Sequence, residues 1–184
     1  MLCAFSDGAG YGIISSSMEK DLPLESMKEF THLDKEGNPT MVDVGDKVAT
    51  ERIALARAVV SVEQEILALL ENNEIQTKKG PIFQTAILAG IMATKKTSDL
   101  IPLCHPLMIS QANVEIVVSD EGKIIVNCQV KVSGKTGVEM EALTGASVAA
   151  LTIYDMCKGF SHNIIIEEVK LIKKTGGKSD FERD

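Results

Sequence analysis

The sequence GKTGVEMEALTGASVAALTIYDMCK, residues 134–158, has the periodicity of one long helix. Apolar or small side chains recur in it at three- and four-residue steps, as in an amphipathic helix. These steps fall on Met140, Leu143, Ser147, Ala150, Leu151 and Tyr154. Gly137 can introduce the helix and Gly159 can end it. We therefore predict a long helix that packs this stripe against the rest of the fold.

Charged residues interrupt this otherwise apolar helix near its end. Asp155 and Lys158 are separated by three residues, so their side chains are neighbours on the helix surface. Together they can form one site, with Asp155 as a proton acceptor and Lys158 as a phosphate partner or proton donor. The alternative is a plain surface ion pair, because exposed pairs at this spacing are common and weak.

Glu141 lies fourteen residues before Asp155, close to the same angular face of the predicted helix. A rise of roughly 1.5 Å per residue separates the two by about 21 Å along the axis. They therefore cannot form a carboxylate pair within one subunit. If both contact substrate, either the ligand is long or one of them serves a pocket in a neighbouring subunit, which points to an oligomer.

Gly145 lies inside the same helix. A glycine there costs about 1 kcal/mol of helix stability relative to alanine unless close packing uses it. We expect a close contact with another helix or another subunit at this position.

A second informative segment, GIMATKKTSDLIPLCHPL, covers Gly90–Leu107. It predicts a helix that ends at Lys95, followed by an extended loop. Pro102 and Pro106 restrict their own backbones and the residues before them, so His105 lies on a stiff loop. His105 can bind a phosphate or carbonyl oxygen there, or it can make a structural hydrogen bond.

The remaining pattern predicts strands and helices of ordinary length. A possible capping box at Ser61 and Gln64 would begin a helix that runs through Leu70. The other expected elements are a strand at 52–60, a helix at 82–95, a hairpin of strands at 114–118 and 123–132, and a strand at 163–172. Helices segregated against a small antiparallel sheet predict an α+β fold with the helices packed on one face.

Composition limits the class of protein. A chain of 184 residues suits one compact domain. The net charge of -7 and the few aromatic residues argue against a general nucleic-acid surface. No apolar run is long enough to span a membrane and no secretion signal is evident, so we expect a cytoplasmic protein.

The four cysteines are widely spaced and form no C-x-x-C pair, which argues against a zinc or iron–sulfur site. We expect reduced thiols. Cys128 and Cys157 are predicted to pack as small apolar residues. Because Cys104 is adjacent to His105, a nucleophilic role for its thiol remains an alternative.

Residues 1–28 differ in composition from the rest, with Gly8, Gly10 and Gly12 but no hydrophobic periodicity, and we expect a flexible extension. Their GAGYG segment lacks the full spacing of a dinucleotide loop. Gly134-Lys135-Thr136 and Gly177-Lys178-Ser179 both lack the earlier glycine of a phosphate-binding P-loop.

Three further motifs complete a recognisable set: FTHLD at residues 30–34, MVDVGDK at 41–47 and KKTGGKS at 173–179. With the two longer segments, and in the same order and spacing, they resemble the cyclic pyranopterin monophosphate synthase family of molybdenum-cofactor biosynthesis. The resemblance covers residues from about 30 to 179. It implies a ferredoxin-like topology, a synthase domain at 29–179 and a C-terminal tail at 180–184.

The resemblance implies a lyase that converts a cyclised dihydro-GTP to cyclic pyranopterin monophosphate and expels pyrophosphate. Asp155 corresponds to the principal acid/base, with Lys158 and Lys79 assisting. The implied substrate-binding residues are Leu103, Cys104, His105, Met140, Glu141, Glu139, Lys95, Lys47 and Arg52. In this reading His105, and not Cys104, has the functional role, and His105, Lys95 and Arg52 are the candidates for holding the triphosphate.

The resemblance also implies a homohexamer, built as a trimer of dimers with sites at the subunit interfaces. No dedicated metal-ligand cluster is visible, so no cofactor is expected apart from a magnesium ion that can accompany the triphosphate. Pro81 and Ile87 depart from the family pattern, so part of the pocket rim can differ. Two alternatives remain: a structural or regulatory protein that has lost turnover, and a generic nucleotide-binding module.

Overall fold

A computed structural model describes residues 32–34 and 36–183. The predicted extension at residues 1–28 lies outside this part of the chain. The elements are β1 (Thr50–Ser61), α1 (Gln64–Leu67), β2 (Leu70–Glu71), β3 (Glu74–Thr77), β4 (Gly80–Pro81), α2 (Ile82–Thr94), α3 (Thr97–Leu100), β5 (Gln111–Val118), β6 (Lys123–Gly134), α4 (Glu139–Cys157), β7 (Ile165–Thr175) and β8 (Phe181–Glu182). The short strand β8 falls within the segment expected to be a C-terminal tail.

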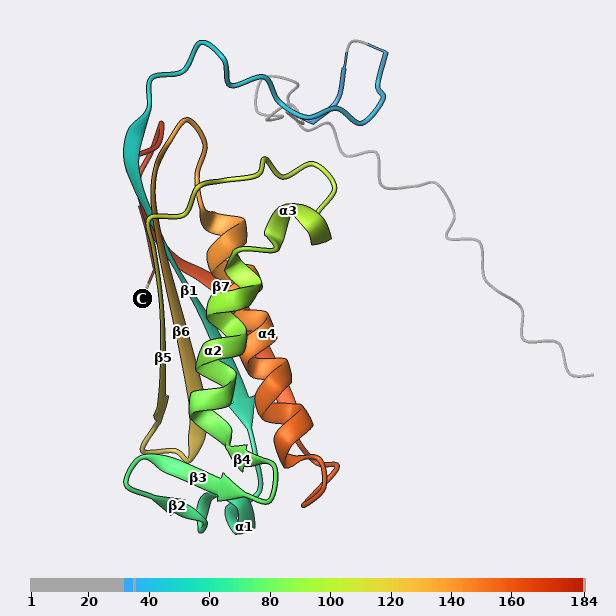
Figure 1. Cartoon of the computed structure of the whole chain (residues 1–184), viewed down its shortest axis with the longest axis vertical. Coiled ribbons are helices and arrows are strands. Elements are labelled where there is room, and N and C mark those ends of the chain that lie inside the picture. The colour runs from blue at the N-terminus through green and yellow to red at the C-terminus, as the bar shows by residue number, and fades with distance from the viewer. Residues whose placement is uncertain (1–31, 35, 184) are drawn as a thin grey trace, which may run out of the picture. The chain divides into compact units, whose positions relative to one another are not determined.

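The main sheet has five strands in the order β5-β6-β1-β7-β8. All neighbouring strands pair antiparallel. Helices α2 and α4 cover one face of this sheet (Figure 1). The chain order β1-α2-β5-β6-α4-β7, with β1 between β6 and β7, is the ferredoxin-like arrangement. The predicted α+β fold with helices on one face is confirmed.

Strict alternation in β6 explains how the sheet forms its core. Every second side chain of this strand is buried, namely those of Ile124, Val126, Cys128, Val130 and Val132. This period of two places them on the face that the helices cover. Cys128 and Cys157 are fully buried, as predicted, and burial raises the pKa of the Cys128 thiol to about 12 and that of Cys157 to about 11. Both are therefore protonated, unreactive core residues at neutral pH.

Helix α4 forms where predicted, but the predicted apolar stripe is wrong in part. Leu151 and Met140 are exposed, whereas Ala150 is buried. The middle of the buried face is made mainly of small residues, namely Ala142, Gly145, Ala146, Ala149 and Ala150, followed by Ile153. Because α4 packs against both α2 and the sheet, short side chains allow the close approach that larger ones would prevent.

Gly145 is a point of close approach between α4 and its neighbours. A Cβ atom at this position would lie 2.5 Å from the Cys128 sulfur of β6 and 2.8 Å from Cγ2 of Thr94 in α2. On the facing helix, a Cβ at Gly90 would lie 2.9 Å from the Gly145 carbonyl oxygen. The expected helix–helix contact is therefore present, and the glycines allow it.

We predict that Gly145→Ala destabilises the fold although alanine favours helices. The gain of about 1 kcal/mol in helix propensity is outweighed by overpacking, which costs roughly 1–3 kcal/mol. The free energy of unfolding, measured with denaturant at fixed protein concentration, should fall by up to about 2 kcal/mol. Gly159→Ala is the control, because its Cβ would meet nothing within 4 Å. An unchanged or higher unfolding free energy for Gly145→Ala would contradict this account.

A small second sheet, β2-β3-β4, was not predicted. Asn72 and Asn73 both have positive φ, 51° and 61°, which suits the two-residue turn between β2 and β3. The predicted capping box is wrong: Ser61 ends β1, and α1 is a four-residue helix with Glu63 at its N-cap and no side-chain cap. Helix formation stops early because the chain turns into β2.

The N-terminus of α2 is capped from this second sheet. The Glu74 carboxylate accepts hydrogen bonds from the backbone N–H groups of Phe83, at 2.8 Å, and Gln84, at 3.0 Å. These are free donors of the first helical turn, which a carboxylate satisfies well. The contact ties β3 to α2. Pro81 precedes the helix as its N-cap, and Ile87 is half-buried against the core.

The segment after α2 differs from the predicted extended loop. A four-residue helix, α3, begins at Thr97, and the loop that carries Pro102 and Pro106 follows it. Thr97 is buried, and its hydroxyl donates to the Thr94 carbonyl at 3.1 Å, which continues the helical path past Lys95. Within the described residues, none of the helices combines the length and apolar character needed to cross a membrane.

Candidate active site

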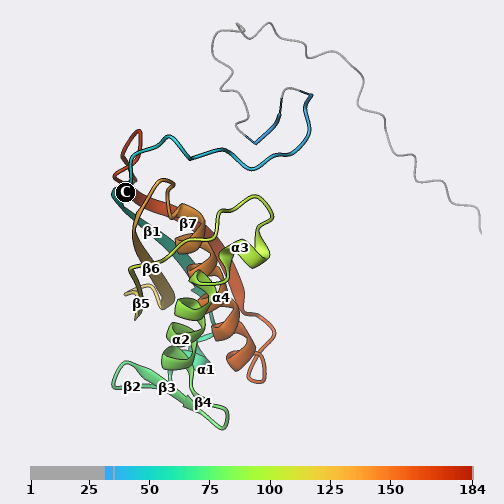
Figure 2. The ribbon, with the colours of Figure 1, turned by 45° about the horizontal axis from the view of Figure 1, so that its top comes forward.

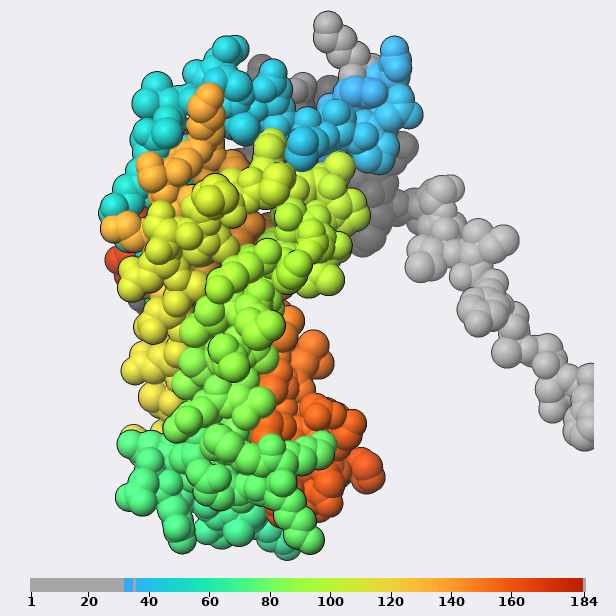
Figure 3. All heavy atoms as spheres, viewed as in Figure 1, coloured from blue at the N-terminus to red at the C-terminus, as the bar shows by residue number. Residues whose placement is uncertain are grey.

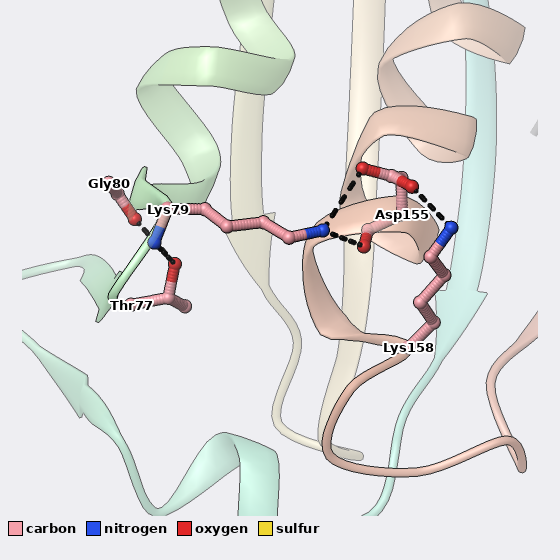
Figure 4. A network of polar contacts seen from close by, with 5 residues as sticks. All are labelled: Thr77, Lys79, Gly80, Asp155 and Lys158. Carbon is pink, nitrogen blue, oxygen red and sulfur yellow. Dashed lines mark hydrogen bonds and ion pairs between the residues drawn. The ribbon is translucent and has the colours of Figure 1, made fainter.

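The three predicted catalytic residues meet at the C-terminal end of α4 (Figure 4). Asp155 lies in the last turn, and Lys158 follows as the C-cap residue. Lys158 Nζ lies 2.7 Å from Asp155 Oδ1. Lys79, from the turn between β3 and β4, places its Nζ 3.4 Å from Asp155 Oδ2 and 3.2 Å from the Asp155 carbonyl oxygen. One carboxylate is thus held between two ammonium groups from different parts of the chain.

The charges of this cluster set its protonation. The hydrogen bond from Lys158 is the largest cause that lowers the pKa of Asp155, and the positive charges of Lys158 and Lys79 lower it further. In return, the hydrogen bond to Asp155 raises the pKa of Lys158. At neutral pH Asp155 is therefore a carboxylate and Lys158 an ammonium group. Asp155 can accept a proton in this state, and Lys158 can donate one.

We predict that Lys158→Met raises the pKa of Asp155 by removing the strongest of these influences. An NMR titration should place the Asp155 midpoint below its ordinary value of 3.8 in the native chain and higher in the variant. Because the native pKa is lowered, the stability it contributes is present above pH 3.8 and is lost as the pH falls through the native pKa. The variant should lose less stability over that range.

Asp34 provides the internal reference for this titration. Its pKa is lowered mainly by a hydrogen bond from the Asn38 backbone, which the substitution leaves in place. Its midpoint should therefore not move. An Asp155 midpoint equal in the two chains would show that Lys158 does not control this carboxyl group.

A separate pocket of about 80 Å³ lies at the N-terminal end of α4. Three predicted binding residues, Lys95, His105 and Glu141, line it together. Its other lining residues are Thr94, Thr97, Ser98, Pro106, Leu107 and Ile109. The end of α2, α3, the loop with Pro106 and the start of α4 supply these walls, so His105 and Lys95 line the same pocket.

Glu141 gives this pocket an unusual carboxyl group. Only 4% of the residue is exposed, and burial raises the pKa of its side chain, with a further contribution from the charge of Glu139. Burial, and secondly the charge of Glu141, raise the pKa of the Cys104 thiol. Little of the Cys104 side chain is therefore thiolate at neutral pH, which makes it a poor nucleophile.

The loops beside the start of α4 carry further predicted residues. Arg52 Nε donates to the Gly134 carbonyl oxygen at 2.9 Å, so the guanidinium group is fixed beside the loop that leads into α4. Glu139 pairs with Lys174 at 3.0 Å. Lys47 is exposed in the segment before β1.

Apart from Lys47, most of the predicted site residues thus fall into two groups at opposite ends of α4. The two ribbon views show β3 and β4 near one end of this helix and α3 near the other (Figures 1 and 2). Asp155, Lys158 and Lys79 lie at the C-terminal end. At the N-terminal end lie Lys95, His105 and Glu141 in the pocket, with Glu139 and Arg52 in the adjoining loops. Leu103, Cys104 and Met140 are close in sequence to His105 and Glu141, but they do not line the pocket themselves.

Two residues that the sequence did not predict as part of the site contact predicted site residues or the turn that carries one. Lys174 pairs with Glu139, and the KKTGGKS motif contained it without singling it out. Thr77 bonds to the backbone of the turn that carries Lys79, and no sequence motif marks it. Among residues 32–34 and 36–183, no group of three or more histidine, cysteine, aspartate or glutamate residues is placed to hold a metal ion.

Comparison with known proteins places these groups in a family context. The MoaC family model matches residues 41–177. "Cyclic pyranopterin monophosphate synthase" of Helicobacter hepaticus is 51% identical over 158 residues, which cover 85% of this chain and 98% of that protein.

Two longer relatives share the same region. "Molybdenum cofactor biosynthesis protein 1" of Dictyostelium discoideum is 49% identical over 168 residues, covering 82% of this chain and 27% of the relative. "Molybdenum cofactor biosynthesis bifunctional protein" of Synechocystis is 54% identical over 155 residues, covering 82% of this chain and 45% of the relative. This chain therefore spans less than half of either longer protein. The match over residues 41–177 and the identity to a relative of nearly equal extent establish that the chain belongs to the MoaC family.

Proposed function

We propose that this chain is a cyclic pyranopterin monophosphate synthase. It converts (8S)-3',8-cyclo-7,8-dihydroguanosine 5'-triphosphate to cyclic pyranopterin monophosphate and releases pyrophosphate, an early step of molybdenum cofactor biosynthesis. The observation that carries the proposal is the 51% identity over 98% of the Helicobacter relative of that name. The paired charges of Asp155, Lys158 and Lys79 supply groups suited to the reaction.

The reaction needs proton transfer at two stages. The purine-derived rings must open and close again as a pterin, which calls for proton donors and acceptors within hydrogen-bond reach of ring nitrogens and hydroxyl groups. A substrate hydroxyl oxygen must then bond to the α-phosphorus, while the bond from that phosphorus to the bridging oxygen of pyrophosphate breaks. The hydroxyl proton leaves to a base, and pyrophosphate carries away the bonding electrons.

Asp155 is the proposed proton acceptor, because it is ionised at neutral pH and the two lysines hold its carboxylate in one place. Lys158 and Lys79 are the proposed partners that donate protons or balance developing negative charge. Such fixed cations stabilise phosphoryl transfer without rearrangement at the moment of reaction. Lys95, His105 and Arg52 are the proposed ligands of the triphosphate.

We further propose that the complete site forms between copies of the chain. A pocket of about 80 Å³ is much smaller than the roughly 300–1,000 Å³ of sites that enclose molecules of this size. The two charged groups stand about 21 Å apart along α4, by its rise of 1.5 Å per residue. Leu88 and Met92 on α2 and Leu151 on α4 are exposed apolar side chains that a second copy can cover. A homohexamer, a trimer of dimers, is the assembly that the resemblance implies.

The expected compartment is the cytoplasm. Cys104, Cys128 and Cys157, the cysteines within the described residues, are free thiols. Such reduced cysteines suit a compartment in which thiols are kept reduced. No resident cofactor is proposed, and a magnesium ion would enter with the triphosphate.

The decisive assay incubates the purified chain with the cyclised dihydro-GTP and follows pyrophosphate and pterin together by mass spectrometry. Both products should form in equal amounts. Parallel reactions with added magnesium and with EDTA test whether a cation accompanies the triphosphate. Binding without either product would favour a protein that has lost turnover, and equal binding of GTP and ATP would favour a generic nucleotide-binding module.

A further inference from the structure

The turn that carries Lys79 is shaped by one hydroxyl group. Thr77 and Gly80 face each other in the register of β3 and β4, so Lys78 and Lys79 form the tip of a two-residue turn. The Thr77 hydroxyl donates to the Gly80 carbonyl oxygen at 2.9 Å and accepts from the Lys79 backbone N–H at 3.1 Å (Figure 4). The same hydroxyl oxygen is therefore hydrogen-bonded to the backbone of two turn residues, Lys79 and Gly80.

Neighbouring features also define the shape and place of the turn. Gly80 has a φ of 113°, a conformation that glycine adopts readily and other residues rarely do, so the turn closes here without backbone strain. Thr77 is half-buried and β-branched, which restricts its side chain to few rotamers and keeps the hydroxyl in place. Glu74 ties the same strand to the start of α2. Both ends of the turn are thereby attached to the fold.

Lys79 needs such support because its side chain is long and exposed. Its Nζ reaches Asp155 across the surface, where β2–β4 and the C-terminal part of α4 lie side by side (Figure 3). More than half of each side chain, 57%, is exposed. An exposed ion pair holds a flexible lysine only weakly, since forming it costs side-chain entropy and water screens it. The backbone of Lys79 must therefore be placed correctly before its ammonium group can find Asp155.

We propose that Thr77 is a positioning residue that directs Lys79 toward Asp155 through its two hydrogen bonds to the turn. Its effect on turnover rests on the proposed function, because Lys79 and Asp155 act there as charge partner and proton acceptor. Loss of the hydroxyl leaves the Lys79 N–H to water and removes the side-chain donor from the Gly80 carbonyl, so the turn samples other conformations. Reacting groups that shift by about 1 Å can lose up to about 100-fold in rate.

The test compares Thr77→Val, which keeps the side-chain shape without the hydroxyl, with Thr77→Ser, which keeps the hydroxyl. We expect Thr77→Val to lower kcat by roughly 10- to 100-fold, with KM within about threefold of the native value, and Thr77→Ser to restore most of kcat. Thr85→Val is the matched control. It removes the hydroxyl bond to the carbonyl of Pro81, the N-cap residue of α2, and leaves both hydrogen bonds of the Thr77 hydroxyl in place. Thr77→Ala removes the hydroxyl a second way if valine prevents folding.

A second measurement reads the position of Lys79 without turnover. An amine-acylating reagent labels lysines at rates that mass spectrometry can follow, and exposed Lys78 serves as the internal reference in the same peptide. Lys79 should label more slowly than Lys78 in the native chain and in Thr77→Ser, and nearly as fast as Lys78 in Thr77→Val. Unchanged kcat in the folded Thr77→Val variant would overturn the proposal, and so would unchanged labelling. If the native chain converts no substrate, the proposed function fails, while the labelling rates still decide whether Thr77 positions Lys79.

Discussion

Asp155→Ala should lower kcat by about 100- to 10,000-fold, the range expected when a positioned acid/base group is removed. The change takes away the proposed proton acceptor and leaves Lys158 and Lys79 without the carboxylate that holds them. Substrate affinity should change much less, because the proposed triphosphate ligands lie at the other end of α4. Pyrophosphate release under saturating substrate measures kcat, and titration calorimetry measures affinity.

The matched control for this substitution is Glu182→Ala. Glu182 also forms an exposed ion pair, with Lys173 at 3.0 Å, but in β8 and away from Asp155. The Glu182→Ala variant should retain native turnover, because this surface ion pair has no proposed catalytic role. Because the Asp155 side chain is more than half exposed, its removal should leave the fold intact. Native kcat in Asp155→Ala would contradict the catalytic assignment and favour the surface ion pair that the i and i+3 spacing also allowed.

The large elements of the fold could be predicted because their patterns are local. The alternation of Ile124, Val126 and Cys128 predicts a half-buried strand, and the adjacent Lys123 and Val118 bracket its hairpin turn. Glycines on either side of α4 marked its ends within a few residues. Local periodicity also predicted the burial of Cys128 and Cys157, because neighbouring apolar residues share their face.

The errors came from contacts between distant residues. Glu74 caps α2 from nine residues away, which no capping motif at the helix itself could reveal. The prediction for the buried face of α4 is wrong in part because this face packs closely against α2 at Gly90. The need for small side chains there follows from the contact between the two helices, which the sequence of α4 alone does not reveal. Sequence spacing placed Asp155 beside Lys158, but Lys79 was assigned by resemblance, since its contact with Asp155 spans 76 positions.

Mixing two inactive variants should restore activity if the site is shared between copies. His105→Ala alters the N-terminal pocket, and Asp155→Ala alters the charged group at the other end of α4. Each should be nearly inactive alone. In randomly mixed oligomers, half of the sites receive a native Asp155 and half of those a native His105, so turnover should reach about a quarter of the native value.

The control for this experiment is a mixture of two variants that are altered at the same end of α4. Asp155→Ala mixed with Lys158→Ala should stay inactive, because both changes lie at one end of α4 and every shared site receives one of them. Mass spectrometry of the intact assembly must show that the chains have mixed. If they mix and His105→Ala with Asp155→Ala still gives no turnover, each site is contained in one chain. The roughly 21 Å between the two groups would then have to be spanned by the ligand itself, whereas recovery to about a quarter means that neighbouring copies bring them together.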